Sequence, residues 1–227
     1  DAEDARSSWA HQVARRLRAE AHVIAWGGVG LALNDDAGTR PNGAAAPALW
    51  RRAIANDPES AWDVGSWLPH AVLIHLGTND LCCGNEAILS HAEFEQAYVD
   101  FIRQIVAARC SATQAPVQHF FLACGPMGNS KGNRDHTGRE FYFPCSVIER
   151  IAATINQLPF PRSLPPEVEV RAHVLDFAGL MDEQACVGGC SHPSEKLPIF
   201  PKQQLVPGKT GRHVSKYSPW YAPTVWG

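Results

Sequence analysis

The sequence predicts an α/β fold in which helices cover both faces of a mostly parallel sheet. Short apolar runs recur along the chain, segments with the apolar spacing of amphipathic helices separate them, and small or polar residues follow the runs. Strands that alternate with helices form βαβ units, whose strands are parallel. Ligands bind such sheets outside the carboxyl ends of the strands, so the residues after each apolar run are the first candidates for a site.

The first half of the chain predicts, in order, a helix over residues 7–20, a strand over 22–26, a short helix near 46–54 and a strand over 71–77. Trp9, Val13 and Leu17 recur at the spacing of one helical face. The strand HVIAW leads into the glycine-rich turn GGVG, and the strand AVLIHLG leads into Thr-Asn-Asp. Residues 32–60 are otherwise a loop-rich excursion.

The second half predicts a helix over 91–109, a strand over 117–125, a helix over 147–158 and a strand over 167–177. The first of these helices carries a single apolar stripe: Phe94, Tyr98, Phe101, Ile102 and Ile105. The segment from 197 to 227 is rich in proline and has no periodicity, so we expect one domain over residues 1–196 and an irregular tail over 197–227.

Composition excludes several classes of function. The chain has 227 residues, 45% of them hydrophobic and 19% charged, which is a globular balance. A formal charge of −3 provides no basic surface for nucleic acid. No apolar run is long enough to span a bilayer, and the sequence contains no signal peptide.

Seven cysteines are more than a cytosolic domain usually carries: Cys82, Cys83, Cys110, Cys124, Cys145, Cys186 and Cys190. Their spacing does not match a zinc ribbon, so disulfides are favoured over metal binding and over buried free thiols. Disulfides predict a secreted protein or another oxidising compartment outside the cytoplasm.

Three strand ends carry groups suited to ester chemistry. Gly28 lies in the turn after the first strand, where a backbone N–H can approach a ligand; Asn79 follows the second strand, and His192 lies in a loop after the last. A backbone N–H and a side-chain amide can form an oxyanion hole, and a histidine can act as general base. The alternatives are an ordinary glycine turn, an asparagine that forms an Asx-turn or caps the next helix, and a structural histidine.

In these residues and the segments around them, the sequence resembles the SGNH or GDSL-type esterases, most closely the acetyl-xylan esterases of carbohydrate esterase family two. The matching segments are HVIAWGGVG, WDVGSWLPHAVLIHLGTND, AYVDFIRQI, ACGPM and GCSHPS. The resemblance implies a flavodoxin-like three-layer sandwich with a short parallel sheet. It also implies Gly28 and Asn79 as oxyanion donors, His192 as base, acetyl esters of carbohydrates as substrates, and no metal or other cofactor.

The chain departs from the family pattern in its nucleophile. Family members carry a serine in a Gly-Asp-Ser turn after their first strand, and no Gly-Asp-Ser occurs here. Ser7 and Ser8 begin a helix and are expected to cap it. The family's aspartate three residues before the histidine is replaced by Gly189, and three prolines between 197 and 207 interrupt its closing helix.

We therefore expect the first strand to be missing from this chain. That strand lies inside the family's sheet, and buried unpaired backbone groups cost about 1–3 kcal/mol each. An upstream segment, a protein partner or a rearranged sheet must fill the gap. The alternative to an esterase is a non-catalytic structural or sugar-binding subunit of a larger assembly.

The family geometry would also bring the loops after Asn79 and before His192 to one cleft. Two bridges are then possible: one that joins Cys82 or Cys83 to Cys186 or Cys190, and a local one between Cys186 and Cys190.

Overall fold

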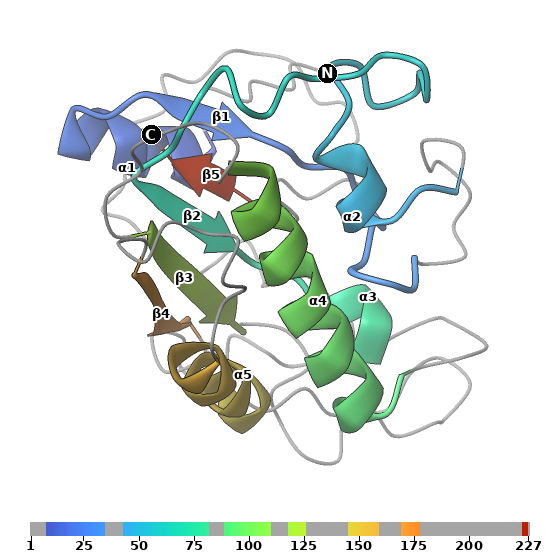
Figure 1. The fold of residues 1–227 in the computed structure, drawn as a ribbon, viewed down its shortest axis with the longest axis vertical. Coiled ribbons are helices and arrows are strands. Elements are labelled where there is room, and N and C mark those ends of the chain that lie inside the picture. Colours follow the sequence, from blue (N-terminus) through green and yellow to red (C-terminus); the bar gives the residue numbers. More distant parts are fainter. Residues whose placement is uncertain are drawn as a thin grey trace, which may run out of the picture.

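The computed structural model describes residues 8–34, 43–81, 89–109, 118–125, 145–158, 169–177 and 224–226 (Figure 1). Its elements are, in order, α1 (Trp9–Leu17), β1 (Ala21–Val23), α2 (Ala46–Leu49), β2 (Ala71–Ile74), α3 (Thr78–Leu81), α4 (His91–Arg109), β3 (Gln118–Cys124), α5 (Cys145–Gln157), β4 (Val170–Asp176) and β5 (Thr224–Trp226). The predicted alternation of helices and strands is confirmed from β2 to β4.

The sheet has five strands in the order β1-β5-β2-β3-β4. β2, β3 and β4 are parallel neighbours, as predicted. β5 is antiparallel to β1 on one side and to β2 on the other, so β1 runs in the same direction as β2 but is not its hydrogen-bonded neighbour. The carboxyl ends of β1, β2, β3 and β4 therefore lie at the same edge of the sheet.

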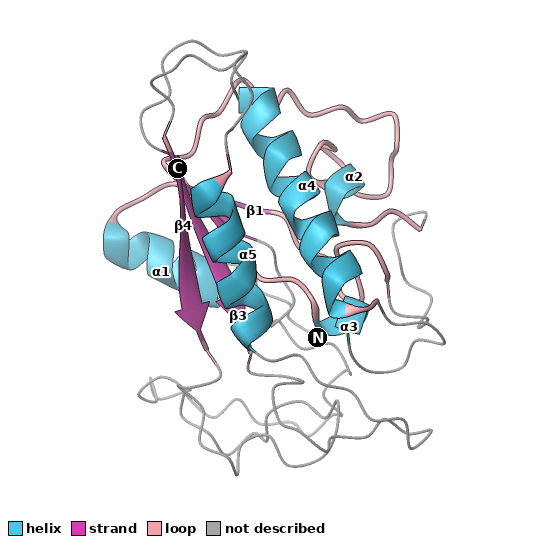
Figure 2. Cartoon of the chain, turned by 60° about the horizontal axis from the view of Figure 1, so that its bottom comes forward, coloured by secondary structure: helices cyan, strands magenta, loops and turns pink. Residues whose placement is uncertain are grey.

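Helices cover both faces of the sheet, with α4 and α5 on one side and α1 on the other (Figure 2). Side chains alternate accordingly along β2. Val72 and Ile74 belong to the larger hydrophobic core, which α4 and α5 complete. Leu73 points the other way and packs with Ala10 and Ala14 of α1 in a smaller core. The three-layer architecture expected from the sequence is present.

Local sequence explains the helix limits. Ser8 caps α1, because its Oγ accepts the backbone N–H of His11, and Arg18 ends the helix in a left-handed conformation with φ of 54°. The cap confirms the prediction for Ser8, while Ser7 lies outside the described residues. α4 has the predicted limits, and α5 begins two residues before the predicted start.

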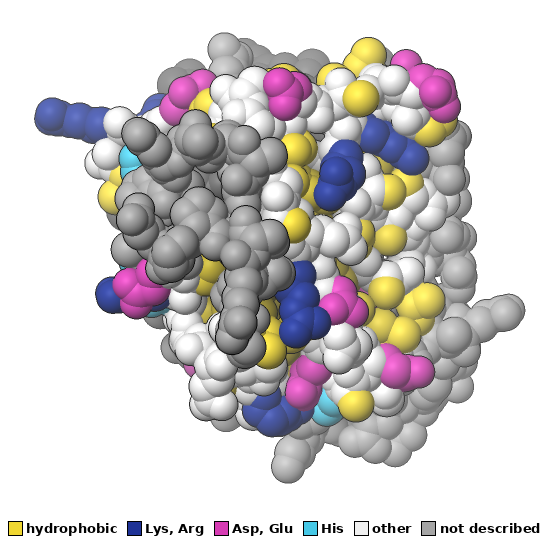
Figure 3. All heavy atoms as spheres, in the orientation of Figure 1, with side chains coloured by type: hydrophobic (Ala, Val, Ile, Leu, Met, Phe, Trp, Pro, Cys, Tyr) yellow, Lys and Arg dark blue, Asp and Glu magenta, His cyan; other side chains and the backbone are white. Residues whose placement is uncertain are grey.

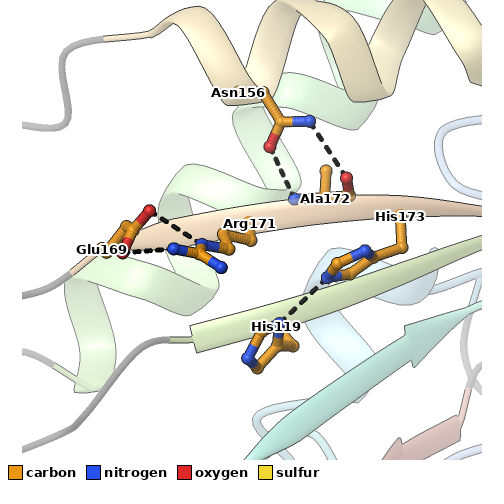
Figure 4. Close-up of polar contacts among 6 residues, drawn as sticks. All are labelled: His119, Asn156, Glu169, Arg171, Ala172 and His173. Atoms are coloured by element: carbon orange, nitrogen blue, oxygen red, sulfur yellow. Dashed lines mark hydrogen bonds and ion pairs between the residues drawn. The ribbon is translucent and has the colours of Figure 1, made fainter.

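The outer edge of β4 is protected by a side chain of α5 (Figure 4). The Asn156 amide oxygen accepts the backbone N–H of Ala172 at 2.8 Å, and its Nδ2 donates to the Ala172 carbonyl at 3.0 Å. Both groups point away from β3, so the asparagine replaces a missing strand at this position.

The gap expected inside the sheet is filled by β5. Residues 224–226 pair with both Ala21–Val23 and 71–73, which makes β5 a central strand. Of the alternatives considered for the gap, the described residues show a rearranged sheet. The sequence did not predict this strand, because it lies in the segment that was expected to be an irregular tail. The boundary proposed at residue 196 lies outside the described residues.

The distribution of charged side chains on the surface agrees with the small net charge of the chain. Acidic and basic side chains are interspersed over the face drawn in Figure 3, with hydrophobic side chains between them. Among the helices that the structure describes, each is too short or too polar to cross a membrane.

Candidate functional site at the carboxyl edge of the sheet

The turn after β1 places a buried glycine at the carboxyl edge of the sheet. Gly28 has φ of 77°, a conformation that glycine adopts readily and other residues rarely do. The Val29 N–H donates to the Trp26 carbonyl at 3.2 Å and closes the turn. Gly28 is buried, and any other residue there would have to adopt this strained backbone conformation.

Asn79 reaches this turn from the next strand. It lies in the short helix α3, which follows β2, and 8% of its surface is exposed. Its Nδ2 donates to the Val29 carbonyl at 3.0 Å. The asparagine is therefore inside a helical turn rather than at the cap position considered from sequence, and its amide contacts the residue after Gly28.

Asp80 joins the same two loops. Its Oδ1 accepts the backbone N–H groups of Ala32 and Leu33 at 2.7 and 2.9 Å, and its Oδ2 accepts that of Leu31 at 2.9 Å. Burial raises the pKa of Asp80, while these hydrogen bonds oppose the rise. The carboxyl group thus binds three consecutive backbone N–H groups, of which that of the buried Leu31 would otherwise be left without a partner.

Close packing fixes a second glycine of this turn. A Cβ added to Gly30 would lie 1.9 Å from the Leu33 carbonyl oxygen and 2.9 Å from Oδ2 of Asp80. The Gly30 N–H donates to Oδ1 of Asn34 at 3.0 Å. The loop therefore folds back tightly on itself, and only a residue without a side chain fits there.

A shielded histidine occupies the same edge, directly after β2. The Nε2 of His75 lies 2.5 Å from the Gly125 carbonyl oxygen, so Nε2 carries the proton and donates. Trp9 and Phe177 pack edge-on against the ring. The Nδ1 atom is buried without a hydrogen-bond partner, and burial lowers the pKa of the ring. His75 is therefore neutral at pH 7.

A disulfide joins Cys124, the last residue of β3, to Cys145, the first residue of α5. The Cα atoms are 5.3 Å apart. The sequence predicted disulfides but not this pair. Cys82, Cys83, Cys186 and Cys190 lie outside the described residues, so both bridges considered for them stay predictions.

An apolar pocket lies apart from these groups, between β1, β2, α2 and α4. Neither Gly28 nor Asn79 lines it. His22 stacks on Trp67 with ring centroids 3.8 Å apart and meets Trp62 edge-on, and 39% of Trp62 is exposed.

The structure thus brings two of the three predicted site residues to adjoining loops. Gly28 and Asn79 follow β1 and β2, whose carboxyl ends share an edge, and Val29 connects them. His192 lies outside the described residues. Sequence reasoning overlooked Asp80, although an acidic residue directly after a buried strand and an asparagine was a usable signal. Neutral N–H donors in a buried turn suit an oxyanion.

Comparison with known proteins gives a consistent picture. No family model matches the chain. The cellulase/esterase CelE of Acetivibrio thermocellus is 32% identical over 127 residues, which are 55% of this chain and 14% of that protein. A carbohydrate esterase family 2 enzyme with a carbohydrate-binding domain, from Corynascus thermopiles (Myceliophthora fergusii), is 26% identical with a TM-score of 0.58, over 84% of this chain and 52% of that chain.

A further solved structure, of a carbohydrate esterase whose active site has divergent catalytic and non-catalytic binding functions, is similar in fold. It has a TM-score of 0.51 at 20% identity, over 83% of this chain and 52% of that chain. This chain spans about half the length of both solved structures and a small part of the curated relative. The parallel strands β2, β3 and β4 with their flanking helices match the family 2 fold. By sequence and by fold, the chain is a relative of the SGNH-type carbohydrate esterase family 2.

Proposed function

We propose that this protein provides the oxyanion hole and the general base of an esterase that removes O-acetyl groups from carbohydrates. The observation that carries the proposal is the 3.0 Å hydrogen bond from the Asn79 amide to the Val29 carbonyl. It holds the side-chain donor beside the backbone turn that contains Gly28. The similarity to a carbohydrate esterase family 2 enzyme supports the substrate class.

In the proposed reaction, a serine hydroxyl attacks the acetyl carbonyl and His192 accepts its proton. The Gly28 N–H and the Asn79 amide stabilise the negative charge that develops on the carbonyl oxygen. His192 then gives the proton to the sugar oxygen as it leaves, so that the acetyl group remains on the serine. Water, deprotonated by the same histidine, attacks this ester and releases acetate and the free serine. The 227 residues contain no Gly-Asp-Ser, so the proposal places the serine outside this sequence.

The Cys124–Cys145 disulfide supports a working environment that is oxidising, because such bonds persist outside the cytoplasm. Secretion is consistent with a carbohydrate polymer as the substrate.

The proposal is tested by hydrolysis of p-nitrophenyl acetate. The 227-residue protein alone should show no turnover, while fusion of an apolar strand ending in Gly-Asp-Ser ahead of Asp1 should create it. In that fusion, His192→Ala should abolish turnover. Asn79→Ala should lower kcat by about 10²–10³-fold, the effect of removing one oxyanion donor.

The matched control is Asn56→Ala, at an exposed position in the turns before β2. It should leave kcat unchanged. Equal kcat values for Asn79→Ala and Asn56→Ala would show that Asn79 does not stabilise the oxyanion, and the proposed site would be wrong.

A second candidate function is a non-catalytic, sugar-binding module. The central position of β5 favours it, because this strand fills the gap where the family would place the strand that carries its nucleophile. The partly exposed Trp62 beside His22 offers an aromatic surface. If the protein is such a module, it should bind xylo-oligosaccharides, and Trp62→Ala should weaken this binding. The Gly-Asp-Ser fusion should then stay inactive.

A further inference from the structure

The disulfide between β3 and α5 has a carboxylate beside it. Asp176, the last residue of β4, places its Oδ1 3.3 Å from the Cys145 sulfur and 3.8 Å from the Cys124 sulfur. The three side chains come from three elements that converge at the carboxyl edge of the sheet. Among the described residues, this is a group whose ligand atoms all lie within 4.8 Å of one another.

The oxidised bridge does not use this carboxylate. A disulfide sulfur carries no proton, so neither cysteine can donate a hydrogen bond to Asp176 while the bond is intact. Reduced thiols can donate, and thiolates together with a carboxylate can share a cation. The arrangement is therefore better suited to the reduced pair than to the oxidised one.

The distances fit a tetrahedral metal ion. Zinc binds sulfur at about 2.3 Å and carboxylate oxygen at about 2.0–2.2 Å, which sets a sulfur-to-oxygen distance of about 3.6 Å in a tetrahedron. The observed distances of 3.3 and 3.8 Å lie on either side of this value. Once the S–S bond is broken, rotation about the two Cα–Cβ bonds can separate the sulfurs to the roughly 3.8 Å that the ion requires.

The surroundings of the two cysteines favour the thiolate form and leave one coordination position of a bound ion accessible to water. Cys145 is the first residue of the 13-residue helix α5, where backbone N–H groups stabilise negative charge. Cys124 is buried, and Cys145 is partly exposed. Water can therefore reach the fourth coordination position.

We propose that Cys124, Cys145 and Asp176 form a redox-gated site for zinc or a similar borderline divalent cation. Two molecules of a small thiol reduce the bridge; they supply two electrons, form their own disulfide, and their protons pass to the two cysteine sulfurs. The cation then binds with loss of these two protons to solvent. In the reverse direction a small-molecule disulfide accepts two electrons from the cysteine thiolates and leaves as two thiols, with protons from solvent; this restores the Cys124–Cys145 bond, removes both thiolate ligands and releases the ion. The site is independent of the proposed esterase chemistry.

The test is an anaerobic Co²⁺ titration of the full 227-residue protein after reduction by a phosphine. One equivalent should give thiolate-to-cobalt charge transfer and the visible bands of tetrahedral cobalt, and Zn²⁺ should displace it. Cys145→Ser should remove the signal, and Asp176→Asn should raise the Kd for Co²⁺ by at least about tenfold. The oxidised protein should give no such bands.

Two controls separate this site from the other five cysteines. Cys110→Ser and Asp100→Asn should leave the Kd unchanged. A Kd that is the same in wild type, Asp176→Asn and Cys145→Ser would overturn the proposal, because the cobalt would then be held by other thiols.

If Cys145→Ser fails to fold, thermal unfolding of the reduced wild type decides. Zn²⁺ should raise the Tm of the reduced wild type, because a ligand that binds only the native state stabilises that state. The rise should be smaller for reduced Asp176→Asn. No effect of Zn²⁺ on the Tm of the reduced wild type would also overturn the proposal.

Discussion

Replacement of Asp80 by asparagine tests the contact that joins the loop after β1 to the loop after β2. In the wild type, Oδ1 accepts hydrogen bonds from Ala32 and Leu33, and Oδ2 accepts one from Leu31, at 2.7 to 2.9 Å. Asparagine keeps the shape of the side chain but replaces one oxygen by an NH2 group. At least one backbone N–H must then face another donor.

The structure gives the size of the effect. A hydrogen bond to a charged group contributes about 1.5–3 kcal/mol, and a buried donor left without a partner costs about 1–3 kcal/mol. Part of this loss is offset, because a neutral amide avoids the unfavourable burial that raises the pKa of Asp80. We expect Asp80→Asn to lower the free energy of unfolding by about 3 kcal/mol, or the Tm by about 6–12 °C.

Urea unfolding at pH 7, followed by tryptophan fluorescence, measures this difference. The matched control is Asp100→Asn on α4, where the carboxylate is half-exposed and pairs with Arg103. Its effect should stay within about 0.5 kcal/mol. An equally small effect of Asp80→Asn would refute the argument that the carboxyl group clamps the two loops.

Four further predictions follow from the same structure. Because burial lowers the pKa of His75, the native ring binds a proton more weakly than the same ring in the unfolded chain. The free energy of unfolding should therefore fall as the pH drops below about 6.5. His75→Phe should flatten this dependence in urea titrations between pH 5 and 8. Gly30→Ala should lower the free energy of unfolding by about 3 kcal/mol, because the new methyl group would collide with backbone. Cys145→Ser should lower it by about 3 kcal/mol, since the disulfide closes a loop with a sequence separation of 21. Val225→Pro should lower it by about 3 kcal/mol or more, because proline removes a backbone N–H from a central strand.

Each of these has a control or a contrary outcome. His70→Gln, at an exposed position before β2, should keep the wild-type pH dependence. Gly65→Ala should be tolerated, because the added Cβ would meet only the Asp63 side chain at 3.3 Å. Unchanged stability of the oxidised Cys145→Ser protein would mean that the bridge does not restrain the native fold. Stability of Val225→Pro within 1 kcal/mol of wild type would contradict a central position for β5.

Elements with a strong local pattern could be predicted from the sequence. The apolar stripe of α4 fixed its limits, and the apolar runs of β2, β3 and β4 located three neighbouring parallel strands. The Gly28 turn and Asn79 could be assigned to one edge, because parallel strands end on the same side. The part played by His192 stays a prediction.

The features that the sequence left open depend on contacts between distant residues. β5 has three residues and no apolar alternation, and it becomes a strand by pairing with β1 and β2. The Cys124–Cys145 bridge depends on which thiols meet in space, which spacing along the chain does not determine. Asp80 is a structural clamp because the loop from 31 to 33 folds over it. Its place after a buried strand marked it as a candidate, but the sequence does not show which backbone groups it binds.

The central position of β5 has a consequence for how the protein folds. In the sheet that the structure describes, β5 lies between β1 and β2 and follows β2 by about 150 residues, so a very large loop must close before the two parts of the sheet pair. Contacts that are this distant along the chain slow folding. During synthesis, β5 is the last of the described elements to leave the ribosome. Until it pairs, β2 has an exposed edge with unpaired backbone groups, and such edges can pair with strands of other molecules. We therefore expect refolding yield to fall steeply with protein concentration, and a peptide with the sequence of β5, added during refolding, to compete for the same position.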